Sequence, residues 1–276
     1  MSDAGRAGGG ITSESGRRPL ALRLTLVLGA VLLMAAFVAL GSWQLQRLYW
    51  KNALIVRIDQ RVHDAPGAPP GAASWAQFQA GAAAEEYRRV RLSGVFLDHL
   101  SARVQATTVL GSGFWLLTPL CRADGTIVLV NRGFLAPGPE TRQLLPSRAA
   151  GDACAPLTGS GAQVGAVELT GLLRLSEPGG AFLRHNDALA NRWYSRDVPA
   201  IAAARGLTRV APFFVDADAR APGAPKAPNA SGQPVGGLTV IHFNNNHLVY
   251  ALTWYALAGM VAAACVWLVR EERGRR

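Results

Sequence analysis

The sequence predicts a membrane protein in which two transmembrane helices, one N-terminal and one C-terminal, bracket an exported, mainly antiparallel β domain with one or two helices (α+β). Residues 24–40 contain no charged or strongly polar side chain, and residues 248–269 are uncharged throughout. The segment between them has the mixed composition of a soluble domain. A chain of 276 residues that is 50% hydrophobic and 17% charged is too apolar for a disordered protein and too charged for a transporter with many spans.

The first span is predicted at 23–44, after a cytoplasmic tail at 1–22. The neutral stretch continues as far as Gln44, so roughly 20 residues can cross the hydrocarbon core of the bilayer. The alternative is a cleaved signal peptide, but the apolar run is longer than the hydrophobic region of a normal one. Apolar side chains then continue at helical spacing, which predicts that the helix extends beyond the membrane. These side chains are Leu48, Ile55, Ile58 and Val62.

The second span is predicted at 248–269, and a cytoplasmic tail follows at 270–276. At about 1.5 Å per residue this span reaches roughly 33 Å, slightly more than a ~30 Å bilayer core. The tail after it is rich in arginine, whereas no Lys or Arg lies between Lys226 and the span. The positive-inside rule therefore puts both termini in the cytoplasm and exports residues 45–247.

The predicted location is the plasma (inner) membrane of a bacterium, with the central domain in the periplasm. The N-terminal residues contain Asp3 and Glu14 and are Gly-rich, which is unlike the amphipathic Arg/Ser helix of a mitochondrial transit peptide. Of the net charge of +10, the segment 47–247 carries an excess of six, from 20 Lys+Arg and 14 Asp+Glu, and this excess is modest and scattered. We interpret it as solvated surface with some affinity for anionic lipid headgroups, and expect no nucleic-acid partner.

Strand-like runs in the exported domain alternate apolar and polar residues only roughly. They are predicted at 89–96, 114–120, 126–134, 167–175, 212–215 and 238–243. A soluble helix is predicted at 198–205, with Asp197 as its N-cap and Gly206 as its terminator. Composition predicts a loop or linker at 63–86 and turn-rich insertions at 137–165 and 216–237.

The chemistry-bearing residues of the exported domain are few. Three cysteines without a C-x-x-C pair exclude a disulfide-built mini-domain, a structural zinc site and a paired-thiolate copper carrier. Cys121 and Cys154 can meet in an oxidising compartment, although two unpaired buried thiols fit the sequence equally well. Familiar hydrolase and nucleotide-binding signatures are absent, so no catalytic residue is predicted. His185 and Asp187 form a candidate acid–base pair, for which a hydrogen-bonded structural loop is the favoured alternative.

A histidine lies where the second span begins. Three asparagines precede His247, and the positive end of the helix dipole disfavours an imidazolium there, so this ring is expected to be neutral and able to ligate iron. The same helix face continues through Tyr250 or Ala251, Trp254 and Ala258. On the first span, Trp43, Arg47 and Trp50 share one face at the same depth.

If the spans pack together, these residues predict an aromatic-lined site with one nitrogen ligand and one guanidinium. Such a site suits a flat apolar ring that bears carboxylates, as haem does. In this hypothesis His247 is the axial ligand of the haem iron, Trp43, Tyr250 and Trp254 contact the ring, and Arg47 contacts a propionate. The alternative is that the histidine and the tryptophans only anchor the helices at headgroup depth.

The order of several motifs resembles the surfeit locus protein (SURF) family of cytochrome c oxidase assembly factors. The motifs that carry the resemblance are GSWQLQR at 41–47 with Trp50 and Lys51, 86–94, Thr118 with Pro119, VNRGF at 130–134, NRWY at 191–194 with Asp197, and NNHL at 245–248 with Tyr250 and TWY at 253–255. The segments 63–86 and 137–165 are longer than is usual in the family.

The resemblance implies a membrane protein that binds or delivers haem a, transiently, during maturation of the large subunit of cytochrome c oxidase. The family's proposed haem-ligating histidine falls on His247. The expected partners are that large subunit, proteins of haem a synthesis or other assembly proteins, and membrane lipid, and no enzymatic turnover is implied. The alternative functions are a docking protein of the assembly complex that does not bind haem, and an exported enzyme that uses His185 or Asp187.

Overall fold

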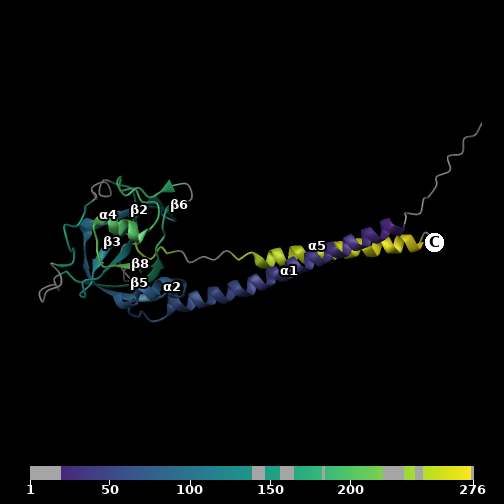
Figure 1. Cartoon of the computed structure of the whole chain (residues 1–276), viewed down its shortest axis with the longest axis horizontal. Coiled ribbons are helices and arrows are strands. Elements are labelled where there is room, and N and C mark those ends of the chain that lie inside the picture. The colour runs from purple at the N-terminus through teal and green to yellow at the C-terminus, as the bar shows by residue number, and fades with distance from the viewer. Residues whose placement is uncertain are drawn as a thin grey trace, which may run out of the picture. The chain divides into compact units, whose positions relative to one another are not determined.

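A computed structural model describes residues 20–138, 147–155, 165–181, 184–219, 233–239 and 245–274. The chain divides into two compact units (Figure 1). One unit is a helix pair, made of helix α1 (Leu20–His63) up to Leu54 and helix α5 (His247–Gly274). The other unit, the β domain, lies within Ile55–His242.

The helix pair is antiparallel, and its two helices lie side by side (Figure 1). Arg23 of α1 approaches Glu272 of α5 at one end, with 3.8 Å between nitrogen and oxygen. At the other end, Asn245 just before α5 donates to the side-chain oxygen of Asn52 at 2.7 Å. Both helices are long and apolar enough to cross a membrane, and most of their apolar side chains are exposed. This arrangement confirms two apolar terminal helices and the extension of the first one beyond residue 44.

The β domain contains a six-stranded sheet whose order is β1-β5-β8-β4-β3-β2. These strands are β1 (Arg89–Phe96), β2 (Ala102–Thr108), β3 (Gly111–Cys121), β4 (Ile127–Leu135), β5 (Val167–Leu175) and β8 (Val210–Ala217). Strand β1 also pairs with the end of β3, which closes five of the strands into a barrel and leaves β2 beside β3. The pairs are antiparallel except β4 with β8, so a mainly antiparallel domain is confirmed. A small hairpin joins β6 (Gly180–Ala181) to β7 (Arg184–His185).

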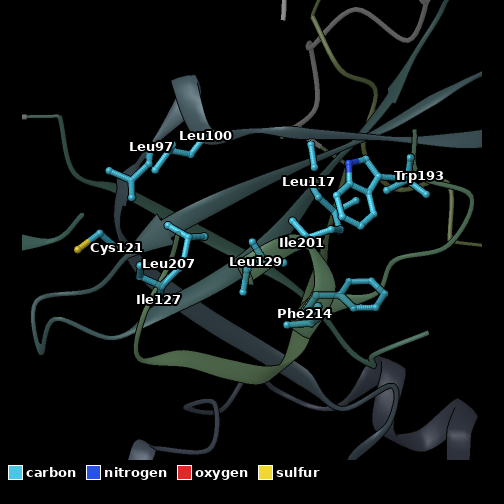
Figure 2. Close-up of a cluster of buried hydrophobic side chains, with 14 of the residues drawn as sticks. Leu97, Leu100, Leu117, Cys121, Ile127, Leu129, Trp193, Ile201, Leu207 and Phe214 are labelled. Carbon is cyan, nitrogen blue, oxygen red and sulfur yellow. The ribbon is translucent and has the colours of Figure 1, made fainter. Parts of the chain in front are cut away.

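Two hydrophobic clusters explain why the strands alternate only roughly. Helix α4 (Val198–Arg205) and Trp193 close one cluster, which Figure 2 shows around Leu129 and Phe214. Helix α2 (Trp75–Glu85) contributes Phe78 to the other cluster. Successive residues of β4 and β8 point into opposite clusters, and a strand covered on both faces is apolar at nearly every position.

The predicted soluble helix is confirmed as α4, because its ends carry strong local signals. The Asp197 carboxylate accepts from the Ala200 N–H at 3.1 Å, which satisfies one of the free donors at the start of the helix. Gly206 has a φ of 66°, the left-handed conformation that ends helices and that glycine adopts without strain.

The predicted linker at 63–86 is wrong, because it contains a short 3₁₀ helix η1 (Ala72–Ser74) and then α2. Composition alone misses this helix, because a segment rich in Ala, Gly and Pro resembles a linker although Ala has the highest helix propensity of all residues. The tertiary contact that stabilises this helix is the packing of Phe78 against Phe213 of β8, with ring centroids 5.1 Å apart.

The strand predictions at 89–96 and 167–175 coincide with β1 and β5, and three others lie within two or three residues of β3, β4 and β8. Strand β2 was missed. In the run predicted at 238–243, Leu238 and Thr239 are not in a strand, and the rest lies outside the described residues. The insertion predicted from 216 is wrong at its start, because Asp216 and Ala217 complete β8.

Cys121 and Cys154 form a disulfide, with 5.8 Å between their Cα atoms, so the paired alternative is the correct one. Both cysteines are buried, and the bond ties the end of β3 to the segment beside α4. We expect a Cys121→Ser/Cys154→Ser variant to lose about 2–5 kcal/mol of unfolding free energy, because the unfolded chain regains the freedom of the closed loop.

Denaturant unfolding of the full chain in detergent, followed by tryptophan fluorescence, measures this loss. Cys265→Ser is the matched control, because Cys265 is a free thiol in α5. Equal stability of the double variant and this control would contradict a structural role for the disulfide.

Candidate functional site

His247 occupies the first position of α5, and its ring faces α1. The imidazole Nδ1 lies 2.8 Å from the side-chain oxygen Oε1 of Gln44. Ala251 and Ala258 follow on the same face of α5 and are buried against α1. The predicted face of this helix is therefore the one that packs on its neighbour.

The contact with Gln44 decides which ring nitrogen of His247 carries a proton. An amide oxygen can only accept a hydrogen bond, so Nδ1 of His247 donates to Gln44 Oε1. In a neutral imidazole the other nitrogen, Nε2, then keeps its lone pair. The helix pair therefore presents one histidine nitrogen that is available as a ligand.

The alignment of the two helices depends on a close approach at Gly41. The ring of Tyr255 lies against Gly41, where an added Cβ would come within 2.9 Å of two ring atoms. The Tyr255 hydroxyl and the Ser42 hydroxyl share a hydrogen bond of 3.1 Å. One turn further along α1, Gln44 contacts His247. The packing at Gly41 therefore fixes the position of the imidazole along the axis of α1.

Arg47 lies between two tryptophans of the same helix. Its guanidinium carbon is 6.0 Å from the ring centroid of Trp43 and 5.2 Å from that of Trp50, within the range of cation–π attraction. Trp43 is 50% exposed and Trp50 is 54% exposed. The spacing of three and four residues along α1 puts these three side chains in one row, as expected from the sequence.

The two aromatic residues predicted on α5 differ in their surroundings. Trp254 is half-buried and stacks on Phe37 of α1, with ring centroids 5.7 Å apart. Tyr250 is 56% exposed. The structure thus brings His247 and Trp254 into contact with α1. Among the described residues, no hydrogen bond or ring contact joins His247 to Trp43, Arg47 or Tyr250.

The predicted rows on α1 and α5 run in opposite directions from the contact between Gln44 and His247, because the two helices are antiparallel. Arg47 lies one turn beyond Gln44 on α1, and Tyr250 lies one turn beyond His247 on α5. Because Gln44 contacts His247, these rows start from a shared contact. Tyr255 packs on Gly41, one turn before Gln44 on α1.

The patch around His185 and Asp187 is a hydrogen-bonded loop, as the favoured interpretation predicts. The Asp187 carboxylate accepts from the Ala190 N–H and from Arg192, both at 2.9 Å, and these bonds lower the pKa of Asp187. His185 lies exposed in the small β6–β7 hairpin. A carboxylate held in its ionised form by its own loop is a poor general acid or base, so the argument for an exported enzyme loses its main support.

A second group of charged residues lies inside the β domain. The Asp216 carboxylate is almost fully buried and accepts hydrogen bonds from Asn131 at 2.8 Å, Arg174 at 3.0 Å and Arg196 at 3.2 Å. Arg196 also binds the Glu177 carboxylate. Because each buried charge is paired, we assign this group a structural role in joining β4, β5 and β8.

Glu177 gives this charge group a pH dependence. Burial raises the pKa of its carboxyl, but the hydrogen bond and the charge of Arg196 outweigh burial and hold the pKa below its usual range. The unfolded chain therefore binds this proton more readily. The stabilisation by Glu177 is complete above the unfolded-state pKa and is lost as pH falls through the folded-state pKa.

We therefore expect Glu177→Gln to destabilise the chain at neutral pH and to make its stability less dependent on acid pH. Unfolding curves of wild type and variant between neutral and acid pH measure both effects. A constant difference in stability across that range would contradict the assignment of the lowered pKa to Glu177.

A cleft of about 360 Å³ lies on the β domain, between the ends of β1, β5 and β8. Phe96, Arg132, Thr170 and Asp218 contribute to its lining. Arg132 is already engaged, because its guanidinium binds Asp98 and lies 4.5 Å from the ring centroid of Phe96. Asp218 is paired with Arg89 and Thr170, so Arg132, Thr170 and Asp218 all have partners within the domain.

Sequence reasoning did not find Gln44, Ser42 or Gly41 as site residues. Gln44 could have been found as a polar side chain on the packed face of an otherwise apolar helix. Gly41 could have been found as a small residue in a membrane-type helix, since small residues allow two helices to pack closely. Among the described residues, no group of three or more His, Cys, Asp or Glu side chains is placed to hold a metal ion.

Comparison with known proteins gives consistent matches over both helices and the β domain. The model of the family described as SURF1 family matches residues 31–259. Surfeit locus protein 1 of the mouse, Mus musculus, is 31% identical over 262 residues, covering 88% of this chain and 74% of that protein. The SURF1-like protein of Monosiga brevicollis is 32% identical over 248 residues, covering 86% of this chain and 84% of that protein. Human surfeit locus protein 1 is 30% identical over 255 residues, covering 85% of this chain and 74% of that protein.

Proposed function

The chain belongs to the SURF1 family, and from this membership and the geometry at His247 we propose that it is an assembly factor for cytochrome c oxidase that binds haem a. In this proposal the helix pair holds haem a transiently and delivers it to the large subunit of the oxidase. The observation that carries the proposal is the hydrogen bond of 2.8 Å that leaves Nε2 of His247 available as a ligand.

The residues present fit haem rather than a bare metal ion. A bare ion needs several protein ligands, whereas iron in a porphyrin has four ring nitrogens and needs only axial ligands. His247 supplies one such ligand. Haem also carries carboxylates, and the guanidinium of Arg47, which lies near two indole rings, carries the positive charge that would bind them.

The side chains around His247 have distinct roles in this proposal. Nε2 of His247 ligates the iron, and Arg47 binds a carboxylate of the ring. Trp43, Tyr250 and Trp254 offer apolar surface to the macrocycle, and two of these rings are at least half exposed. Bound haem a would supply the redox-active iron that the oxidase needs, and this chain's own residues would orient it and keep its carboxylates near the membrane surface.

The proposed location is the plasma membrane of a bacterium, with both termini in the cytoplasm and the β domain in the periplasm. Two helices have the length and composition of membrane spans, and buried Cys121 and Cys154 are joined in a disulfide. Disulfides persist in oxidising compartments such as the periplasm and are rare in the cytosol. The β domain would then dock the oxidase subunit or other assembly proteins on the periplasmic side.

Titration of the purified full chain with haem a tests the proposal. The expected result is a saturable Soret band and a haem content that approaches one ring per chain. A chain that stays colourless after removal of excess haem would contradict haem binding. That outcome would favour the alternative function, a docking protein of the assembly complex in which the exposed tryptophans only anchor the helices at headgroup depth.

The SURF1 family is a family of assembly factors and not a known class of enzymes. In keeping with that, we propose that the chain binds and transfers haem a without chemical turnover. A conversion of haem a to another pigment by the purified chain would contradict this part of the proposal.

A further inference from the structure

In the described part of the chain, Gln44 is the only side chain that forms a hydrogen bond with the ring of His247. It contacts Nδ1, and in the proposed function the other nitrogen, Nε2, is the iron ligand. The distance of 2.8 Å between Oε1 and Nδ1 is typical of a hydrogen bond. Because the amide oxygen cannot donate, this bond requires the proton on Nδ1.

Contacts on both sides of this hydrogen bond hold α1 and α5 in the axial register that places Gln44 beside His247. On one side, the Tyr255 ring packs on Gly41 and its hydroxyl meets Ser42 at 3.1 Å. On the other side, Asn245 donates to Asn52 at 2.7 Å. Gln44 itself is half-buried, so its side chain has less freedom than an exposed glutamine has.

We propose that Gln44 is a positioning residue, which fixes the tautomer and the orientation of the His247 ring so that Nε2 is held ready for haem iron. This inference rests on the proposed function, because it assumes that the ligand of Nε2 is iron. Histidines that ligate metals generally donate their other N–H to an oxygen acceptor, and that bond also makes the ligating nitrogen more basic.

The ring assignment is tested without haem. The full chain is labelled with ¹⁵N in histidine only, placed in detergent at a pH where imidazole is neutral, and studied by NMR, with His247→Ala identifying the signal. We expect Nδ1–H in wild type. In Gln44→Met, which keeps the side-chain length but removes the acceptor, we expect the population to shift toward Nε2–H.

The matched control is Gln46→Met. Gln46 undergoes the same chemical change two residues away, but its side chain is exposed. We expect Gln46→Met to keep the wild-type tautomer. Gln44→Glu is the conservative variant and is expected to retain Nδ1–H, because a carboxylate oxygen also accepts. Circular dichroism checks that each variant is folded.

The second readout is the affinity for haem a. We expect Gln44→Met to weaken binding about 10–100-fold, the usual cost of removing the hydrogen-bond partner of a metal-ligating histidine. Gln46→Met and Gln44→Glu should bind haem a with an affinity within about a few-fold of wild type, because both variants keep an acceptor for the Nδ1–H of His247.

Two outcomes would overturn the inference while haem binding stands: Nε2–H in wild type, or equal haem affinity in Gln44→Met and Gln46→Met. A different outcome would overturn the proposed function. If wild type shows Nδ1–H that depends on Gln44 and yet binds no haem a, Gln44 orients the ring but the ligand is not haem.

Discussion

In the His247→Ala variant, we expect the Soret band of bound haem a to disappear while the chain keeps its secondary structure. His247 supplies the axial nitrogen in our account, and the contacts that align the helix pair lie at Gly41, Ser42 and Asn52, which the substitution leaves in place. The loss of affinity should exceed the roughly 10–100-fold that removal of an outer hydrogen-bond partner costs. Absorption spectra and haem content per chain measure it.

The control for this variant is His185→Ala, which removes an exposed histidine of the β6–β7 hairpin. It should bind haem a like wild type, so that a general effect of losing an imidazole is separated from loss of the ligand. Haem content in His247→Ala equal to that in His185→Ala would show that the iron ligand lies elsewhere in the chain.

Gly41→Leu is expected to separate the two helices, to weaken the binding of haem a and to lower the stability of the helix pair. Even a Cβ at residue 41 would lie 2.9 Å from the Tyr255 ring, so a leucine must displace this ring and break its bond to Ser42. Overpacking of this kind typically costs about 1–3 kcal/mol. Because Gln44 lies one turn from Gly41, the imidazole should lose its acceptor in the same step.

Gly29→Leu is the matched control for Gly41→Leu. Gly29 belongs to the same apolar helix, but a Cβ there would meet nothing within 4 Å. Unfolding of both variants in a denaturing detergent, followed by circular dichroism, compares their stabilities, and a haem a titration compares their affinities. If the two variants behave alike, the close approach of Tyr255 to Gly41 does not determine the helix alignment.

The sequence predicted those elements whose signals are local. The limits of α4 follow from a capping carboxylate and a left-handed glycine, and both apolar helices follow from composition over about 20 residues. Helix α2 and strand β2 were missed because contacts distant in sequence stabilise them. Phe78 packs on Phe213, and β2 pairs with β3 along its length.

The candidate site was predictable on each helix separately but not across the pair. Helical spacing put Trp43, Arg47 and Trp50 in one row, and the structure confirms that row. Which residue of α1 lies opposite His247 depends on the rotation of α1 about its axis and on its axial shift relative to α5. That arrangement is set by the packing of Tyr255 on Gly41, which no periodicity within either helix reveals.

The most direct test of the central claim is resonance Raman spectroscopy of the haem a complex of the full chain, prepared with natural-abundance or ¹⁵N-labelled histidine. Ligation by Nε2 of His247 predicts an iron–nitrogen band that shifts on labelling and is absent from His247→Ala. A band that is insensitive to the label, or that persists in His247→Ala, would contradict the claim that the helix pair presents this imidazole to haem iron.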